Sequence, residues 1–369
     1  MAPTQGLLTY NHFQLRTVSF KSEHKRPIVI AGPCSAETRD QVLSTARALK
    51  DHPQVSYFRA GLWKPRTRPN SFEGVGEEGL EWLSDVQSEV GIPVMTEVAN
   101  AEHAELALKH GLDAVWIGAR TTVSPFSVQN IADALKGTSI PVLVKNPMHA
   151  DLGLWMGAIE RIQAATSGEV AALHRGFSNY GQHKYRNAPM WELPIGLKSE
   201  TPDIALFCDP SHISGTKALL SQVSQKAMDL GMGGLMLETH SDPSSALSDP
   251  QQQITPDELF SLLGNLEIRS SVADSPSDAD LSALRIKMDS IDEQLLELLS
   301  GRMEIARFMG EYKKQHGLTV LHLERWREIV STRMNWSSDL GLSDEFIIKV
   351  LEQVHKESIR VQSDIMNEE

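Results

Sequence analysis

Cysteine is scarce in this 369-residue chain, which contains only Cys34 and Cys208. Two thiols cannot build a disulfide framework, and this composition suits a reducing compartment. The chain also lacks an apolar run of the roughly 18 residues that a membrane-spanning helix needs, and its polar first residues lack the charged-then-apolar order of a secretory signal. We therefore expect a cytoplasmic protein that does not enter a membrane.

Basic residues are also fewer than acidic ones: the chain has 35 lysines and arginines and 48 aspartates and glutamates, and its formal net charge is -13. Nucleic-acid binding depends on clustered cations that neutralise phosphates, so this balance argues against that partner. An anionic substrate would need a local basic pocket. The 41% of apolar residues is ample for a core, and the length exceeds what one core usually serves, so we expect two globular domains.

Eight short apolar runs rich in β-branched residues alternate with amphipathic stretches of helical length. The runs lie at 28–33, 56–62, 93–98, 114–119, 141–147, 171–177, 204–210 and 234–240. Continuous apolar runs are typical of strands buried on both faces, and eight strand–helix units in roughly 240 residues are the number in a (β/α)8, or TIM, barrel. We therefore predict an α/β TIM barrel within residues 1–266.

A second domain is predicted after residues 267–280, whose Ser, Asp and Pro content and lack of periodicity indicate a linker. From Leu281 to Met309 apolar residues recur every three or four positions, which predicts one amphipathic helix from about 280 to 316. Two further helices are predicted near 321–335 and 343–366. The domain at 281–369 is thus expected to be all-α, with three helices.

The first of these helices would be about 55 Å long, whereas a compact unit of 90 residues has a radius of gyration of only about 12 Å. Its own domain could not cover such a long apolar stripe. We therefore predict an intertwined homodimer through the helical domain, and the sequence leaves open whether dimers pair further.

Four residues at or just beyond the predicted strand ends have the chemistry of metal ligands, and they are Cys34, His212, Glu238 and Asp249. Chemistry in such barrels collects at the C-terminal ends of the strands. A thiolate, an imidazole and two carboxylates suit a divalent transition ion such as Mn, Fe, Co or Zn better than Mg. Each residue alone has a structural interpretation, as a buried thiol, a hydrogen-bonded histidine or a helix cap, so the prediction depends on the set.

Basic residues end several of the same runs. Lone cations are mostly solvated surface groups, but cations at the ends of consecutive buried strands converge on the barrel mouth. Guanidinium groups match carboxylate and phosphate geometry, so a small phosphorylated carboxylic acid is the natural ligand. The five residues are Arg59, Lys64, Arg120, Lys145 and Arg175.

Taken in order, these segments resemble a known enzyme family. The motifs AGPCS, FRAGLWKPRTRPNSFEG, IGAR, LVKNP, LHRGF, DPSH and LETHSDPSSALSDPQQQ together are similar to those of 3-deoxy-D-arabino-heptulosonate 7-phosphate (DAHP) synthases, specifically the type I beta group, over nearly all of residues 25–265. The resemblance implies condensation of phosphoenolpyruvate with erythrose 4-phosphate, the first step of the shikimate pathway.

The resemblance also implies roles for individual residues. The metal bound by the four ligands would polarise the aldehyde of erythrose 4-phosphate as a Lewis acid, and the five cations would hold phosphoenolpyruvate. Lys64 could transfer a proton at the aldehyde oxygen, or it could act purely through its charge. The residues that would contact the sugar phosphate are Lys64, Pro65, Arg66 and Thr67.

An alternative for this domain is the sister enzyme on the same barrel, 3-deoxy-D-manno-octulosonate 8-phosphate synthase, which uses arabinose 5-phosphate. Its family carries a loop similar to KANRS, whereas this chain has KPRTRP at 64–69. The loop therefore favours the four-carbon sugar.

Polar residues lie on or beside the apolar face of the helical domain at Arg285, Arg302, Lys313, Arg325, Ser358 and Gln362. Cations beside an apolar seam are costly unless an anion compensates them, so the set indicates a pocket for a dianion. For any one residue, a side chain that snorkels at a dimer interface is the alternative. Through LSALRIKMDSIDEQLLELLSGRMEIARFMGEYK and HKESIRVQ, residues 281–366 resemble the all-helical chorismate mutases.

This second resemblance implies rearrangement of chorismate to prephenate without covalent or metal chemistry. Arg302 and Arg325, with Arg285 from the partner chain, would hold two carboxylates. Lys313 and Gln362 would donate to the ether oxygen, where negative charge develops, and Ser358 would complete the pocket. The departures are His322 and Trp326, which stand where the family usually has acidic residues and affect the expected contact to the substrate hydroxyl.

Fusion of an early step to a branch-point step suggests that chorismate or prephenate in the helical domain inhibits the barrel. Three interpretations stay open: an enzyme with two activities, a synthase with a non-catalytic sensor domain, and a helical module that serves only dimerisation. The polar set on the helices argues against the last, because a mere seam would favour apolar residues there.

Overall fold

The computed structural model describes residues 19–20, 27–65, 72–178, 180, 184–269, 278–321 and 323–367, with the backbone alone at 278–280, 323, 335 and 338. The chain divides into two compact units, Met1–Ser271 and Val272–Glu369. Most of the predicted linker, at 270–277, lies outside the described residues.

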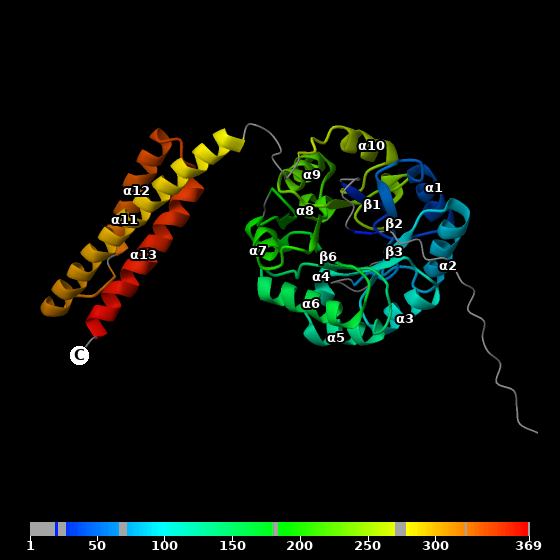
Figure 1. Cartoon of the computed structure of the whole chain (residues 1–369), viewed down its shortest axis with the longest axis horizontal. Helices are drawn as coiled ribbons and strands as arrows, with labels where there is room; N and C mark the ends of the chain where they lie inside the picture. The colour runs from blue at the N-terminus through cyan, green and yellow to red at the C-terminus, as the bar shows by residue number, and fades with distance from the viewer. Residues whose placement is uncertain are drawn as a thin grey trace, which may run out of the picture. The chain divides into compact units, whose positions relative to one another are not determined.

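The first unit confirms the predicted barrel, with eight parallel strands closed into a ring (Figure 1). Each predicted apolar run overlaps one barrel strand, but most strands end before the run does, because the polar residues that close the runs enter the loops at the barrel mouth. In their order around the barrel, the strands are β1 (Ile28–Gly32), β10 (Gly234–Glu238), β9 (Ala205–Cys208), β6 (Val170–His174), β5 (Val142–Lys145), β4 (Ala114–Ile117), β3 (Val94–Val98) and β2 (Val55–Arg59).

Helices surround the strands. They are α1 (Arg39–Leu49), α2 (Glu78–Asp85), α3 (Ala101–Lys109), α4 (Ala119–Thr122), α5 (Pro125–Ala134), α6 (Leu152–Ala165), α7 (Glu192–Glu200), α8 (Pro210–Ser214), α9 (Leu220–Asp229) and α10 (Pro256–Gly264), with short helical turns at Val86–Val90, Lys217–Leu219 and Pro243–Ser245. A small antiparallel pair, β7 (Phe177–Ser178) and β8 (Asn187–Ala188), follows β6. The short helices α4 and α8 directly follow β4 and β9 and so lie at the barrel mouth.

The alternating direction of side chains along the strands explains why the barrel mouth is polar. The apolar core inside the barrel includes Tyr57, Met95, Leu143, Leu173, Phe207 and Met236. Successive strand residues point to opposite faces, so the residue two positions after each of these also faces the interior. Those positions hold Arg59, Glu97, Lys145, Arg175, Asp209 and Glu238. A charged layer therefore lies directly above an apolar one.

Phe20 closes the N-terminal end of the barrel interior. Its ring centroid lies 5.7 Å from that of Tyr57 and 5.7 Å from that of Phe207, and the side chain is buried. The Phe20 backbone amide and the Ser19 hydroxyl both donate hydrogen bonds to the carboxylate of Glu169, the hydroxyl at 2.7 Å. A short segment from before β1 is thus part of the barrel core.

Replacing Phe20 with alanine is expected to lower the free energy of unfolding of the barrel by about 3–5 kcal/mol, the usual cost of removing a buried aromatic ring. Urea unfolding followed by tryptophan fluorescence measures the change. Phe126→Ala is the matched control, since that ring is 86% exposed and its loss should change stability by less than about 0.5 kcal/mol. Equal effects of the two substitutions would contradict the assignment of Phe20 to the core.

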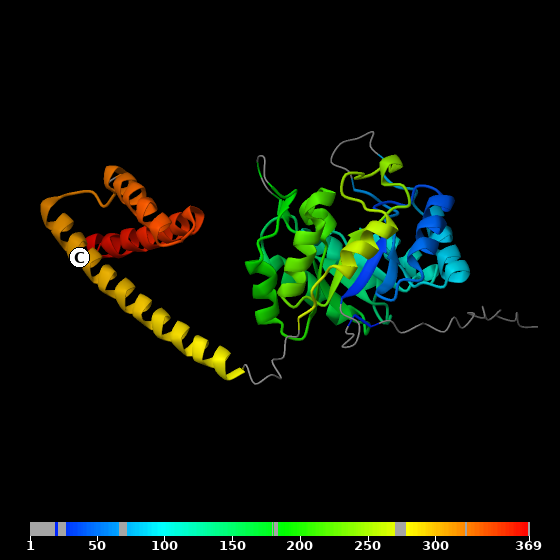
Figure 2. The ribbon, with the colours of Figure 1, turned by 90° about the horizontal axis from the view of Figure 1, so that it is seen from above.

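The second unit confirms the predicted three helices, α11 (Asp278–His316), α12 (Leu323–Asp339) and α13 (Asp344–Asn367). Helix α11 begins slightly earlier than predicted, so the end of the predicted linker is helical. Its N-terminal half extends past α12 and α13 (Figure 2), and the apolar side chains there are 40–73% exposed, from Leu281 to Leu298. The stripe is uncovered within one chain, and the intertwined dimer stays a prediction. None of the helices in the described ranges is both long and apolar enough to cross a membrane.

Candidate active sites

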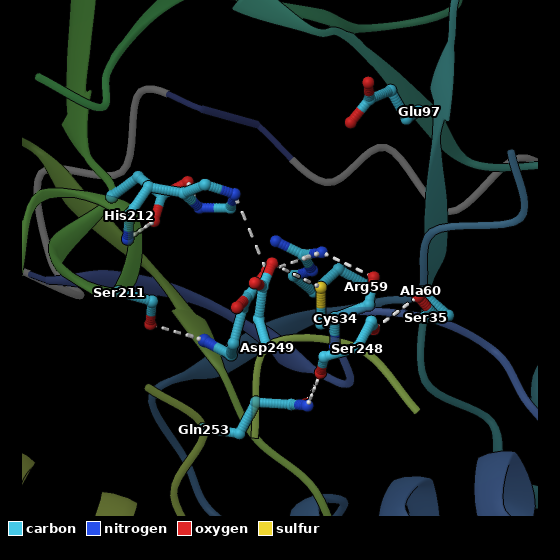
Figure 3. A network of polar contacts seen from close by, with 12 residues as sticks. Cys34, Ser35, Arg59, Ala60, Glu97, Ser211, His212, Ser248, Asp249 and Gln253 are labelled. Carbon is cyan, nitrogen blue, oxygen red and sulfur yellow. Dashed lines mark hydrogen bonds and ion pairs between the residues drawn. The ribbon is translucent and has the colours of Figure 1, made fainter. Parts of the chain in front are cut away.

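The four residues predicted to bind a metal lie together at the barrel mouth, and Figure 3 labels Cys34, His212 and Asp249 among them. Donor atoms of Cys34, Glu238 and Asp249 all lie within 4.8 Å of one another. Nε2 of His212 is 3.8 Å from Oε1 of Glu238, and Figure 3 shows the side chains of Cys34, Asp249 and His212 pointing toward one another. Their role as ligands stays a prediction, but the fold gathers a thiol, an imidazole and two carboxylates.

Hydrogen bonds between two loops bring Cys34 next to Asp249. The Cys34 amide donates to Oε1 of Gln253 at 2.9 Å, and the hydroxyl oxygens of Ser35 and Ser248 are 2.6 Å apart. Ser35 belongs to the loop after β1, whereas Ser248 and Gln253 belong to the loop after β10. As a result, Sγ of Cys34 lies 3.6 Å from Oδ2 of Asp249.

Asp209, to which the sequence analysis gave no role, organises the centre of the site. It is fully buried, and its Oδ1 accepts a hydrogen bond from the His212 amide at 3.1 Å, which caps α8. Its Oδ2 lies 2.8 Å from Nδ1 of His212 and 2.9 Å from Nζ of Lys145. A carboxylate that holds one ring nitrogen of a histidine leaves the other nitrogen for a metal. The sequence signal that could have identified Asp209 is its position two residues after the inward-facing Phe207, which places it inside the barrel mouth.

Burial and neighbouring charges set the ionisation of the cluster. Burial, together with the Glu238 carboxylate, raises the pKa of Cys34 to about 11. Burial alone would raise the pKa of Glu238, but His212, Arg59 and Lys64 lower it to about 2. Burial lowers the pKa of His212, which favours neutral imidazole. Oε1 of Glu238 has no hydrogen-bond partner among the described residues, so a carboxylate, a neutral imidazole and an ionisable thiol fit a divalent cation.

Arg59 supplies a buried positive charge beside the cluster. Its side chain is 1% exposed, its Nη2 lies 3.4 Å from Oε1 of Glu238, and its guanidinium lies 4.8 Å from the ring centroid of Trp116. Its Nε and Nη1 have no hydrogen-bond partner within the part of the chain that the structure describes. Because unsatisfied buried donors are costly, this guanidinium is well suited to a carboxylate or phosphate ligand.

The other predicted cations lie around the same mouth. Nζ of Lys64 is 3.3 Å from Sγ of Cys34, and Lys145 pairs with Asp209 as described above. Burial lowers the pKa of Arg175 to about 10, and a smaller contribution comes from the charge of the exposed Arg120 on α4. The predicted anion-binding residues are therefore neighbours, although their roles stay predictions.

Only two of the four residues predicted to contact the sugar phosphate belong to the described residues. Lys64 is half-buried and Pro65 is exposed, whereas Arg66 and Thr67 lie outside the described residues. The ring of Trp63 stacks on that of His103 in α3, with centroids 3.9 Å apart. This stacking anchors the chain immediately before Lys64.

Trp116 and Glu97 are further site residues to which the motifs gave no role. Nε1 of Trp116 donates to Oε2 of Glu97 at 2.9 Å. The indole ring also faces two cations, Arg59 at 4.8 Å and Lys145 at 5.8 Å from its centroid. An aromatic face attracts cations without neutralising their charge, so Trp116 can hold both in place and leave them available to an anion.

The helical unit contains a cavity of about 1000 Å³ between its helices. Lys313 donates to Oε1 of Gln362 at 2.9 Å and to the carbonyl of Val320 at 2.7 Å. Arg302 donates to the hydroxyl of Ser358. Burial lowers the pKa of both Lys313 and Arg302. The predicted residues that line the cavity are Arg302, Lys313, Arg325, Ser358 and Gln362.

Two residues predicted for the helical site, Arg285 and Arg325, are exposed within one chain. Arg285 is exposed on α11 and precedes Arg302 by about 25 Å of helix, so it does not line the cavity of its own chain. Its role in a partner's cavity stays a prediction. Arg325 lines the cavity but is exposed, and its Nη1 lies 2.6 Å from Oε2 of Glu328.

The cavity also contains residues to which the sequence analysis gave no binding role. The ring of Trp326 stacks on that of His355 with centroids 4.3 Å apart, and Nε2 of His355 is buried without a hydrogen-bond partner among the described residues. Arg333 adds a further cation. His322 lies outside the described residues. No carboxylate occurs among the described side chains that line the cavity, which therefore suits an anionic ligand.

Comparison with protein families gives two matches along the chain. The model of the DAHP synthetase I family matches residues 14–270, and the model of chorismate mutase type II matches residues 284–363. The boundary between the two matches falls where the structure divides into its two units.

Individual relatives match the barrel. The chain is 31% identical over 228 residues to a phospho-2-dehydro-3-deoxyheptonate aldolase from Thermotoga maritima, covering 61% of this chain and 64% of that protein, which is less than two thirds of its length. It is 27% identical over 259 residues to a 2-dehydro-3-deoxyphosphooctonate aldolase from Aromatoleum aromaticum, covering 64% and 88%.

Solved structures of the Thermotoga maritima enzyme are similar to the barrel. One crystal structure matches with a TM-score of 0.58 and 27% identity, covering 64% of this chain and 67% of that one. A truncated form matches with a TM-score of 0.56 and 25% identity, covering 64% and 84%.

Proposed function

The chain belongs to the DAHP synthetase I family, and from that membership we propose that its barrel joins phosphoenolpyruvate to erythrose 4-phosphate, forming DAHP and phosphate. The observation that carries this proposal is the cluster of Cys34, Glu238 and Asp249 beside Arg59, whose buried Nε and Nη1 have no hydrogen-bond partner among the described residues. We propose that the helical unit rearranges chorismate to prephenate, because Lys313 and Gln362 meet in a cavity lined by arginines.

In the proposed synthase, Cys34, His212, Glu238 and Asp249 hold a divalent cation, and their sulfur and nitrogen donors favour a transition ion over Mg. A cation bound there supplies Lewis-acid polarisation of the sugar aldehyde. The phosphate and carboxylate of phosphoenolpyruvate are held by the cations of the mouth, which are Arg59, Lys64, Arg120, Lys145 and Arg175.

Lys64 is the residue best placed to act on the aldehyde oxygen. Its Nζ lies 3.3 Å from Sγ of Cys34, and it begins the loop proposed to contact the sugar phosphate. An ammonium in this position stabilises the oxyanion that forms when the new carbon–carbon bond is made, and it can donate the proton that the oxyanion needs.

The choice of sugar separates this function from that of the sister synthase. With Mn²⁺ and phosphoenolpyruvate present, we expect kcat/KM for erythrose 4-phosphate to exceed that for arabinose 5-phosphate by at least about 100-fold. Phosphate release measures both reactions. A preference for arabinose 5-phosphate would make the barrel an octulosonate phosphate synthase instead.

In the proposed mutase, Arg302 and Arg325, with Arg285 from a second chain, hold the two carboxylates of chorismate. Lys313 and Gln362 donate to the ether oxygen as its bond breaks, and the protein contributes no covalent step. Ser358 completes the pocket and orients Arg302 by accepting its hydrogen bond.

We propose that two chains form a homodimer through α11, because its apolar stripe is exposed within one chain. The scarcity of cysteine supports a cytoplasmic location.

We also propose that prephenate or chorismate, bound in the helical unit, inhibits the barrel. Prephenate is expected to lower synthase activity of the full chain by about 5- to 150-fold, the usual range of such coupling. In the full-length variant Arg302→Ala the inhibition should be lost. Inhibition that persists in a variant unable to bind prephenate would contradict the proposal, and inhibition without any turnover of chorismate would make the helical unit a sensor.

A further inference from the structure

The dipeptide Arg186–Asn187 contacts the metal cluster and the anion site at once. Nη1 of Arg186 donates to Oδ1 of Asp249 at 3.0 Å and to Oε1 of Gln252 at 2.7 Å. Nε2 of Gln252 in turn donates to Oε2 of Glu238 at 2.5 Å. One guanidinium therefore holds the carboxylates of both Asp249 and Glu238, directly for the first and through an amide for the second.

Asn187 makes the corresponding link to the anion side. Its Oδ1 accepts from Nη1 of Arg175 at 2.8 Å, and its Nδ2 donates to the backbone carbonyl of His212 at 2.6 Å. The Asn187 side chain is buried, so water does not compete for these bonds. A single amide thus joins a predicted anion-binding cation to a predicted metal ligand.

Two glycines allow the dipeptide to approach this closely. A Cβ on Gly215 would lie 2.5 Å from Cβ of Arg186, and a Cβ on Gly176 would lie 2.9 Å from Cβ of Asn187. Both glycines also have positive φ, +70° and +77°, which other residues adopt only at a cost. Asp249 has a φ of +45° although it is not glycine, so its backbone is held in an unfavourable conformation beside Arg186.

We propose that Arg186 and Asn187 are positioning residues that couple metal binding to anion binding. An anion that fixes Arg175 also fixes Asn187 and, through it, the His212 segment, while Arg186 holds the two carboxylates. Because linkage is reciprocal, the anion strengthens metal binding by the same factor as the metal strengthens anion binding. The inference rests on the proposed function for the identity of the two ligands.

The test measures the dissociation constant of Zn²⁺ for the full-length protein by competition with a chromophoric chelator, with and without phosphoenolpyruvate. Wild-type protein is expected to bind Zn²⁺ at least about fivefold more tightly when phosphoenolpyruvate is present. Asn187→Asp keeps an acceptor for Arg175 but loses the donor to His212 and adds a negative charge, so phosphoenolpyruvate should bind more weakly. At a saturating phosphoenolpyruvate concentration, this enhancement should fall to about onefold. Arg186→Lys should weaken Zn²⁺ binding about 10- to 100-fold even without phosphoenolpyruvate.

Lys184→Ala is the matched control, because Lys184 lies near the dipeptide but its Nζ bonds to Gln222 on α9. It should keep both the affinity and the enhancement, and urea unfolding followed by tryptophan fluorescence should show that the barrel of every variant is folded. An unchanged enhancement in Asn187→Asp, or an unchanged Zn²⁺ affinity in Arg186→Lys, would overturn the inference alone. Wild-type protein that binds neither Zn²⁺ nor phosphoenolpyruvate would overturn the proposed function with it.

Discussion

Cys34→Ala is expected to lose its divalent cation and to reduce synthase kcat/KM by about 10³-fold, because Lewis-acid polarisation of a carbonyl is worth several kcal/mol. The thiol is fully buried, and its Sγ lies 3.6 Å from Asp249 and 3.3 Å from Lys64. Alanine has no donor atom at this buried position, so the cluster keeps only the imidazole and the two carboxylates. Metal content after gel filtration and the rate of phosphate release measure the two losses.

The matched control for this prediction is Cys208→Ala. Cys208 is the other buried cysteine of the chain and lies on β9, but it is outside the metal cluster among the described residues. It should keep its metal and most of its synthase activity.

Since the pKa of Cys34 is raised to about 11, metal binding near neutral pH should release a proton from wild-type protein that Cys34→Ala does not release. A Cys34→Ala protein with full metal content and wild-type activity would refute the assignment of this ligand.

Arg285→Ala and Arg302→Ala are each expected to lower chorismate turnover by about 100- to 1000-fold, as removal of a charge-stabilising donor commonly does. Mixing the two inactive proteins under conditions that exchange subunits should restore activity. In the mixed dimer one cavity has Arg302 from the first chain and Arg285 from the second, while the other cavity lacks both. Random exchange of equal amounts makes half of the dimers mixed, so about a quarter of the wild-type rate is expected.

This complementation depends on where Arg285 lies. Within one chain it is exposed and about 25 Å along the helix from Arg302, so its predicted role in this site requires a neighbouring chain. Arg307→Ala is a suitable control, because Arg307 is also exposed on α11 but does not line the cavity, and it should retain wild-type turnover. If the mixture stays as inactive as its components while mixed dimers are detected, Arg285 does not complete a partner's cavity.

The sequence predicted the fold because buried parallel strands and amphipathic helices leave strong periodic patterns. The same reasoning located Arg59, Lys145 and Glu238, since barrel chemistry lies at the ends of strands. Strand ends were less well predicted, because polar residues that continue an apolar run can lie in the strand or in the loop. The GLMLETH run shows this, as β10 stops at Glu238 and the next residues belong to the loop.

Residues that act through contacts between distant segments could not be predicted in this way. Asp209 gains its importance from Lys145 on β5 and His212 on α8, and neither contact is visible in the DPSH motif alone. Trp326 and His355 stack across two helices without any shared periodicity. Arg186 and Asn187 follow no repeat, and only Asn187 belongs to the short β-pair, so only the three-dimensional structure relates them to the site.

The pairing of β1 with β10 has a consequence for how the protein is made. Gly32 on the first strand lies opposite Glu238 on the last, and Cys34 and Asp249 belong to the loops that follow these two strands. Three of the four predicted metal-binding positions thus meet at the seam where the ring closes. A nascent chain cannot assemble the cluster until nearly the whole barrel has left the ribosome, so metal capture would occur late in folding. The bound ion would then link the loops that follow β1 and β10 and oppose separation of these two strands.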